Sequence, residues 1–260
     1  LVQEESHLYR DESDAGQRLS GINLLPLAPG RASPTLDEVR AAIDASENGP
    51  YPMKIGAVSL ETPVRRADGE MVPLALVRDI ARLARAHGAR LHLDGARLLL
   101  APPAFDLAAY AGEFDTVYVS LYKYLDAPFG AVLAGSKKDI AEARDLRHVY
   151  GGALYQGWMP AVLALDALPK FGPDIAQAHQ RTRQLVSALV ASGKIRERSS
   201  PQASNVFWLE MKQALAEAAF ERGRQAGIRV GRWKDGRIPL YANTTILRRP
   251  VEEYAALFLG

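Results

Sequence analysis

The 260-residue sequence contains no cysteine, and this absence excludes both a disulfide framework and a thiolate metal site. It has no apolar run that approaches about 20 residues, so no segment is expected to span a membrane. The N-terminal stretch LVQEESHLYR looks like neither a signal peptide nor a transit peptide. These absences make a cytoplasmic protein the default expectation.

An excess of charge of one sign is also lacking. The 32 basic and 30 acidic side chains leave a formal net charge of +2, which is too balanced for an electrostatic nucleic-acid binder. The five histidines are scattered and build no metal-binding motif, so no metal site is expected. Hydrophobic residues make up 48% and charged residues 24%, which is ordinary for a globular protein with a sizeable core.

Strand-like and helix-like segments alternate along the first part of the chain. The apolar pattern and the turn residues predict strands at 22–28, 55–60, 90–94, 114–121 and 130–135. They predict helices at 35–46, 73–87, about 104–111 and 139–150. This order of elements predicts an α/β fold in which a mostly parallel sheet is flanked by helices.

The pattern changes after Gly151 and Gly152. Residues 153–195 are nearly all helical in pattern, with interruptions expected near Pro169 and at Gly172-Pro173. A small C-terminal α+β domain is predicted from NVFWLEM, a helix over about 214–225, IRVGRW, IPLYANTT and the final helix PVEEYAALFL. We therefore expect a large α/β domain over residues 1–150, followed by connecting helices and the small domain over residues 151–260.

Two charged residues follow neighbouring strands. Asp94 ends the strand RLHLD, and Lys123 lies just past FDTVYVSL. Ligands bind beyond the carboxyl ends of parallel strands, so both residues belong to that edge. Taken singly, Asp94 before Gly95 could be a turn residue and Lys123 a solvated lysine. Together they match a pyridoxal phosphate enzyme, in which a carboxylate keeps the pyridine nitrogen protonated and a lysine holds the cofactor.

The segments HLDGAR (92–97) and SLYKYLDAPFGAVLAGS (120–136) resemble the threonine aldolase and β-eliminating lyase family of fold-type I pyridoxal phosphate enzymes. Further segments are similar to that family over most of the chain: SHLYRDESDA (6–15), SLET (59–62) and GGALYQ (151–156). The resemblance implies pyridoxal 5′-phosphate as the cofactor and residues 1–150 as an incomplete cofactor-binding domain. It also implies a homodimer or homotetramer with the active site near the subunit interface.

The resemblance implies a role for each matching residue. Asp94 would pair with the pyridine nitrogen, and Lys123 would form the Schiff base with the cofactor. His7 would stack on the cofactor ring, unless it is a surface histidine near a frayed terminus. Arg97 would lie close to the cofactor or the substrate carboxylate, which its planar fork binds through two bonds, unless it is a structural ion-pair partner.

The chain departs from the family at several positions. Pro239 stands where the family has an arginine for the substrate carboxylate, and Arg237, on the same strand face, is the candidate to replace it. Tyr155 occupies the position of another usual arginine. Thr62 stands where asparagine is usual, and Asp126 where glycine is usual. These changes leave the Asp94–Lys123 pair intact and put the identity of the substrate in doubt.

Family members also carry an N-terminal segment with a phosphate-binding loop, and nothing before Leu1 supplies one. The glycines at Gly30 and at Gly151-Gly152 do not follow the pattern of a phosphate-binding helix start. We expect either a truncated or incompletely ordered chain, or a protein that has lost the cofactor.

The activity implied by the resemblance is aldol cleavage of a β-hydroxy, threonine-like amino acid to glycine and an aldehyde. β-Elimination from a β-substituted amino acid uses the same cofactor, as do racemisation and transamination, and Asp94 and Lys123 do not discriminate among them. A degenerate relative that acts as a scaffold is the alternative from another class. About 80–100 further N-terminal residues in the intact gene product would argue against that scaffold.

Overall fold

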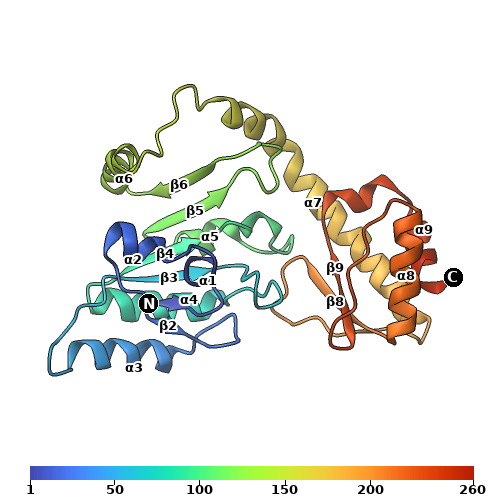
Figure 1. The fold of residues 1–260 in the computed structure, drawn as a ribbon, viewed down its shortest axis with the longest axis horizontal. Coiled ribbons are helices and arrows are strands. Elements are labelled where there is room, and N and C mark those ends of the chain that lie inside the picture. The colour runs from blue at the N-terminus through green and yellow to red at the C-terminus, as the bar shows by residue number, and fades with distance from the viewer. The chain divides into compact units, whose positions relative to one another are not determined.

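The computed structural model describes residues 1–260, which form two compact units (Figure 1). One unit comprises residues 1–101 and 105–168, and the other comprises residues 102–104 and 169–260. The chain passes from the first unit to the second within a single helix, α7 (Met159–Ala191). The domain boundary near residue 150 stays a prediction.

The first unit contains a six-stranded sheet with the order β2-β1-β3-β4-β5-β6. Its strands are β1 (Val2–Gln3), β2 (Pro26–Leu27), β3 (Ala57–Glu61), β4 (Arg90–Asp94), β5 (Thr116–Ser120) and β6 (Ala131–Gly135). All neighbouring strands pair parallel except β6, which runs antiparallel to β5. The mostly parallel sheet is therefore confirmed. The segment 22–28 contributes only two strand residues, and Pro26 is tolerated in them because β2 is an edge strand of the sheet.

The helices of the first unit are α1 (His7–Arg10), α2 (Ala15–Ser20), α3 (Leu36–Glu47), α4 (Leu74–Ala86), the short 3₁₀ helix η1 (Leu98–Leu100), α5 (Leu107–Ala111) and α6 (Lys137–Val149). Four of these helices, α3 to α6, match the predicted segments to within a few residues, whereas α1, α2 and η1 were not predicted. Thr35 and Glu38 form a capping box that starts α3, with each side chain bonded to the other residue's backbone N–H. Pro73 directly precedes α4, since its fixed φ suits a helix start.

Side-chain alternation gives the central strands one apolar and one polar face. Leu60 of β3 and Leu93 of β4 are buried in a core that includes Val39 of α3 and Ile80 of α4. The alternate positions carry the polar side chains, which are Ser59, Glu61, His92, Asp94, Thr116, Tyr118 and Ser120. The polar face of the sheet therefore ends, at its carboxyl edge, in the residues next to the predicted site.

The second unit is a small α+β arrangement, as predicted. Its three-stranded antiparallel sheet has the order β7-β8-β9. Its elements after α7 are β7 (Arg196–Glu197), β8 (Val206–Glu210), α8 (Gln213–Gln225), β9 (Arg237–Tyr241), the 3₁₀ helix η2 (Thr244–Arg248) and α9 (Val251–Leu259).

The interruptions expected at Pro169 and at Gly172-Pro173 are wrong. Both prolines lie inside α7, a continuous helix of 33 residues. Each proline removes one intrahelical hydrogen bond, but its φ near −65° is compatible with the helix. The alanine- and leucine-rich segments on both sides of the prolines have high helix propensity, and their hydrogen bonds keep the helix continuous.

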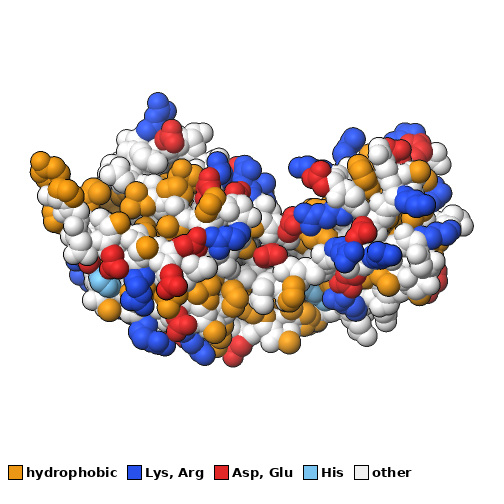
Figure 2. Space-filling view, turned by 90° about the horizontal axis from the view of Figure 1, so that it is seen from below, with side chains coloured by type: hydrophobic (Ala, Val, Ile, Leu, Met, Phe, Trp, Pro, Cys, Tyr) orange, Lys and Arg blue, Asp and Glu red, His pale blue; other side chains and the backbone are white.

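Charged side chains of both signs are interspersed on the face that Figure 2 shows, in keeping with a net charge of only +2. None of the helices combines the length and the apolar sequence that crossing a membrane requires.

Candidate active site

Asp94 and Lys123 come together at the carboxyl edge of the sheet. Asp94 is the last residue of β4 and lies opposite Tyr118 in the ladder with β5. Lys123 lies in the turn that follows β5. The charges of Asp94 and Arg97 both act on the pKa of Lys123, which places all three groups in one electrostatic neighbourhood.

The amine of Lys123 is half-buried at this edge. Burial lowers its pKa, and the positive charge of Arg97 lowers the pKa further, while the carboxylates of Asp94 and Glu61 oppose the shift. The Nζ atom lies 5.5 Å from the centroid of the Tyr122 ring. A lowered pKa increases the share of neutral amine near neutral pH, and the neutral amine is the form that attacks an aldehyde carbon.

Asp94 also has the local role that its position before Gly95 suggests. Its Oδ1 accepts a hydrogen bond of 3.1 Å from the backbone N–H of Ala96. Gly95 is required for packing, because a Cβ there would lie 2.7 Å from the carbonyl oxygen of Tyr118 on β5. The turn orients the carboxylate through the bond that Oδ1 accepts. The turn role and the site role are therefore compatible.

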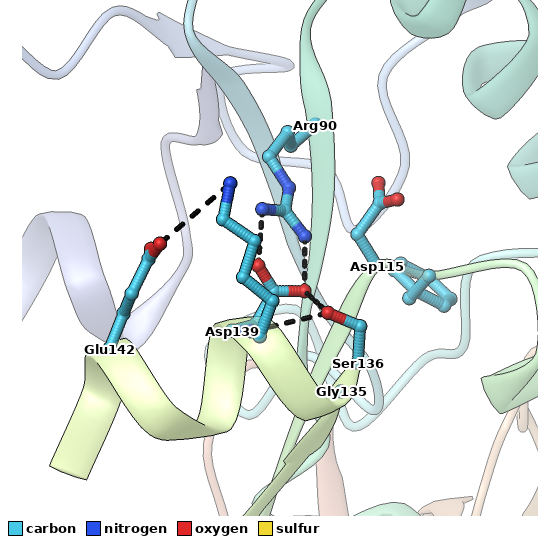
Figure 3. Close-up of a pocket in the computed structure, with 8 residues that line it drawn as sticks. Arg90, Asp115, Gly135, Ser136, Asp139 and Glu142 are labelled. Atoms are coloured by element: carbon cyan, nitrogen blue, oxygen red, sulfur yellow. Dashed lines mark hydrogen bonds and ion pairs between the residues drawn. The ribbon is translucent and has the colours of Figure 1, made fainter.

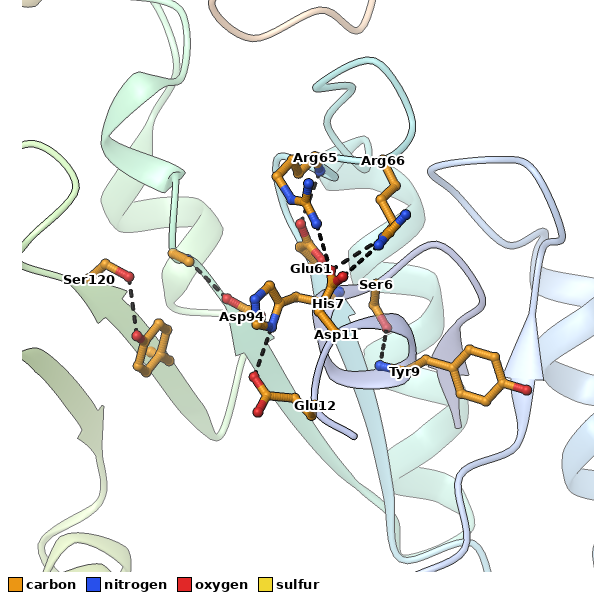
Figure 4. Close-up of polar contacts among 12 residues, drawn as sticks. Ser6, His7, Tyr9, Asp11, Glu12, Glu61, Arg65, Arg66, Asp94 and Ser120 are labelled. Atoms are coloured by element: carbon orange, nitrogen blue, oxygen red, sulfur yellow. Dashed lines mark hydrogen bonds and ion pairs between the residues drawn. The ribbon is translucent and has the colours of Figure 1, made fainter. Parts of the chain in front are cut away.

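His7 is the first residue of α1, and two acidic residues hold it. Its Nδ1 lies 2.8 Å from Oε1 of Glu12, and its backbone N–H donates to Oε2 of Glu61 at 2.6 Å. Ser6 caps the same helix through a bond from the N–H of Tyr9. Figure 4 shows the imidazole at the same edge as the Asp94 carboxylate. The stacking of His7 on a cofactor ring stays a prediction.

Glu61 was not predicted from the sequence as a residue of the site. This carboxylate is only 3% exposed and lies directly opposite Asp94 in the β3–β4 ladder. Burial raises its pKa, and the bonds that it accepts from the N–H groups of Arg65 and His7 oppose that shift. A signal existed, because Glu61 is the single charged residue of the apolar stretch IGAVSLE.

The sequence reading also missed a pair of arginines next to the site. Arg65 and Arg66 both bind Asp11, at 2.6 Å and 2.5 Å. The hydrogen bond from Arg66 lowers the pKa of Asp11 to about 2, and Arg65 adds to the effect. The positive charge of Arg65 also acts on Lys123. The carboxylate of Asp11 thus binds two guanidinium groups beside the predicted site (Figure 4).

Arg237, the predicted substrate residue, lies on β9 of the second unit. Its guanidinium carbon is 3.9 Å from the centroid of the Trp208 ring, a stacking contact that orients the planar fork. Pro239 is tolerated on the same strand because β9 is an edge strand of its sheet. The role of Arg237 toward a substrate stays a prediction.

Three positions that differ from the family have local explanations. Thr62 is buried, and its Oγ1 lies 3.1 Å from the hydroxyl of Tyr110 and accepts from the N–H of Val72. Asp126 has a φ of 53°, the left-handed region in which glycine is favoured. Tyr155 is 95% exposed. The three substitutions affect side-chain packing at Thr62, backbone conformation at Asp126 and the molecular surface at Tyr155. They leave the Asp94–Lys123 pair unchanged.

An open pocket lies at the opposite, amino-terminal end of β4 (Figure 3). It is lined by Arg90 and Asp139, which form two hydrogen bonds of 2.6 Å and 2.7 Å, together with Asp115 and Ser136. The hydrogen bond from Arg90 holds the pKa of Asp139 well below its usual range. Arg90 and Asp139 neutralise each other on the wall of this pocket, and the predicted site residues lie at the other end of the strand.

Comparisons with known proteins decide the family. Residues 1–212 match the sequence model of the family described as β-eliminating lyase. The chain belongs to the β-eliminating lyase family. It is 31% identical over 242 residues to an alanine racemase, TOXG, of Cochliobolus carbonum, covering 88% of this chain and 60% of that protein. It is 26% identical over 228 residues to low-specificity L-threonine aldolase 1 of Arabidopsis thaliana, covering 86% and 64%.

The β-eliminating lyase fold extends over the whole chain. A crystal structure from Exiguobacterium, described as a putative aromatic amino acid β-eliminating lyase or threonine aldolase, matches with a TM-score of 0.79 and 26% identity. The match covers 99% of this chain and 73% of that one. The predicted fold-type I architecture is therefore confirmed. The chain spans about three fifths of the length of the curated relatives named above.

Membership of the β-eliminating lyase family implies pyridoxal 5′-phosphate as the cofactor, as the sequence predicted. The donor set at the carboxyl edge fits this cofactor. A carboxylate suits a protonated pyridine nitrogen, and an amine with a lowered pKa suits the aldehyde carbon. Asp94 supplies the carboxylate from the end of β4, and Lys123 supplies the amine from the turn after β5.

The electrostatics of Lys123 lead to a prediction about its pH dependence. Replacing Arg97 by glutamine removes a positive charge that disfavours the ammonium form, so the pKa of Lys123 should rise. The pH at which Lys123 becomes reactive toward acetic anhydride should therefore move upward, measured by mass spectrometry of the modified peptide. The curve for Lys138, an exposed lysine of α6, should stay in place. An unchanged or lower midpoint at Lys123 would contradict the predicted effect of Arg97.

Proposed function

We propose that this chain forms the catalytic part of a pyridoxal phosphate-dependent carbon–carbon lyase. Its reaction is the aldol cleavage of a β-hydroxy, threonine-like amino acid to glycine and an aldehyde. The observation that carries the proposal is the meeting of Asp94 and Lys123 at one sheet edge, with Arg97 acting on the same amine. The similarity to a threonine aldolase over 86% of the chain supports it.

The bound cofactor supplies an electron sink for the charge that develops at the substrate Cα. In the proposal, the carboxylate of Asp94 keeps the pyridine nitrogen protonated by its negative charge. Lys123 would hold the aldehyde carbon of the cofactor, and its amine would carry a proton to or from the substrate. His7, whose imidazole is oriented by Glu12, would cover one face of the cofactor ring.

Substrate binding in the proposal depends on arginine. Arg97 orients the substrate carboxylate through two parallel N–H bonds, since a guanidinium fork matches a carboxylate. Arg237 is the second candidate for this role, and its stacking on Trp208 reduces the freedom that it must lose on binding. A homodimer or homotetramer, with the site near a subunit interface, belongs to the same proposal.

Racemisation is the second candidate, because the alanine racemase of Cochliobolus carbonum is 31% identical to this chain. β-Elimination is the third, because it is the reaction for which the family is named. All three reactions use the same cofactor, and the group that accepts or releases a proton at the substrate decides among them.

Product analysis tests the proposal. The protein loaded with pyridoxal 5′-phosphate is incubated with L-threonine and L-allo-threonine, and separately with L-alanine and L-serine. We expect glycine and acetaldehyde from the hydroxy amino acids. Release of a keto acid and ammonia would establish elimination instead, and D-alanine would establish racemisation. Failure to bind the cofactor would favour a non-catalytic scaffold.

A further inference from the structure

Glu61 has an unusual set of partners for a buried carboxylate. Oε2 accepts the backbone N–H of His7 at 2.6 Å, and Oε1 accepts the backbone N–H of Arg65 at 3.0 Å. His7 begins α1, and Arg65 lies in the loop after β3. One side chain therefore ties two segments, distant in sequence, to the carboxyl edge of the sheet.

The backbone of Glu61 is itself held on both sides. Its N–H donates to Oε1 of Gln3 at 2.6 Å, and its carbonyl oxygen accepts from Nε2 of Gln3 at 3.0 Å. Nε2 of Gln3 also donates to the carbonyl oxygen of Ala32 at 2.7 Å. Both residues are buried, so the position from which the carboxylate reaches His7 is well determined.

The charged groups that interact with Glu61 are residues of the predicted site. Asp94 lies opposite in the ladder, and the charges of Asp94 and Arg97 act on Glu61, as Glu61 acts on Lys123. A buried ionised carboxylate is costly unless hydrogen bonds compensate for lost hydration. Glu61 has two such bonds, one from each segment that it holds, so one buried carboxylate fixes both segments.

We propose that Glu61 is a positioning residue, which fixes His7 and the Arg65 loop relative to Asp94 and Lys123 and thereby shapes the site for pyridoxal 5′-phosphate. The inference rests on the proposed function, since it assigns His7 to the ring of that cofactor. Glu61 acts on the cofactor through the segments that it holds, chiefly through His7, because each of its carboxylate oxygens already accepts a backbone N–H group. A neutral amide at this position has one acceptor oxygen for two N–H groups and leaves one of them without a partner.

Glu61→Gln tests the inference in the protein loaded with pyridoxal 5′-phosphate. We expect the dissociation constant for the cofactor, from absorbance titration, to rise about 10- to 100-fold, as is typical when a residue that orients a ligand-binding side chain is lost. Hydrogen exchange at the amides of His7 and Arg65 should accelerate about tenfold or more in the cofactor-free protein. The absorbance band of the lysine-bound cofactor should persist at saturation, because Lys123 is retained.

The matched control is Asp115→Asn. Asp115 also accepts a backbone N–H, that of Leu91 at 2.7 Å, but at the amino-terminal end of β4. Its substitution should accelerate exchange at Leu91 and leave the cofactor affinity unchanged. His7→Ala completes a double-substitution cycle. If Glu61 acts through His7, then Glu61→Gln should change the cofactor affinity little in the His7→Ala background.

Several outcomes would overturn the inference. Faster exchange at His7 with unchanged cofactor affinity would make Glu61 a structural tether only, and additive effects of the two substitutions would exclude action through His7. If Glu61→Gln does not fold, Gln3→Met loosens the same residue from its backbone side, and it must then weaken cofactor binding. A wild-type protein that binds no pyridoxal 5′-phosphate would refute the proposed function. Normal binding by both wild type and Glu61→Gln would refute the inference alone.

Discussion

Replacement of Lys123 by alanine is expected to abolish the visible absorbance band of the lysine-bound cofactor and to lower kcat/KM at least about 1,000-fold. Two functions of one amine are lost together. The methyl group of alanine forms no bond with the aldehyde carbon, and it carries no proton to or from the substrate. The lost amine is half-buried next to Arg97 and has a lowered pKa, so an exposed surface lysine does not match its chemistry. Absorbance spectra and steady-state kinetics with L-threonine measure both losses.

The control for this substitution is Lys138→Ala. Lys138 lies on α6 with 84% of its side chain exposed, and its contact with Glu142 is a surface pair of 3.9 Å. Spectrum and kinetics should be those of the wild type. A Lys123→Ala protein that kept the absorbance band would show that another amine holds the cofactor, and the assignment of Lys123 would be wrong.

Asp94→Asn is expected to lower kcat about 100- to 1,000-fold and to retain cofactor binding through Lys123. Asparagine has nearly the same shape and can still accept the N–H of Ala96, so the turn should persist. The loss is that of one negative charge, which favours a protonated pyridine nitrogen. Steady-state kinetics measure kcat, and the pH dependence of the cofactor spectrum reports the proton on the ring.

The matched control is Asp106→Asn. Asp106 accepts the N–H of Ala109 at 2.9 Å and caps α5, so it has the same kind of local bond as Asp94. It should retain wild-type kinetics. Equal losses in the two variants would assign the effect of Asp94→Asn to the turn instead of the charge, and thermal unfolding of both proteins separates the two explanations.

Local pattern was sufficient for those features that depend on neighbours in the chain. The apolar alternation in RLHLD and FDTVYVSL placed β4 and β5, and with them Asp94 and Lys123 at strand ends. Pro73 marked the start of α4 because a proline is accommodated before the first helical turn. The prolines of α7 led to a wrong prediction of helix breaks, since a long helix can continue despite the loss of single hydrogen bonds.

Glu61 and Arg65 show why the rest of the site could not be predicted from the sequence. Their relevance depends on the pairing of Glu61 with Asp94, a contact between residues more than 30 positions apart. Strand order and register decide such contacts, and they follow from packing and loop geometry across the whole unit. A charged residue at the end of an apolar strand marks a polar position, but it does not reveal which partner lies opposite.

The amino-acid sequence alone determined the fold class, the family and the cofactor, because periodicity and short motifs are encoded among adjacent residues. Only the tertiary structure decided that Glu61 holds α1 and the Arg65 loop beside Asp94, and that Arg90 and Asp139 form an ion pair at the opposite end of β4. Those arrangements depend on which strands pair and in which register. The register is determined by contacts between residues that are far apart along the chain.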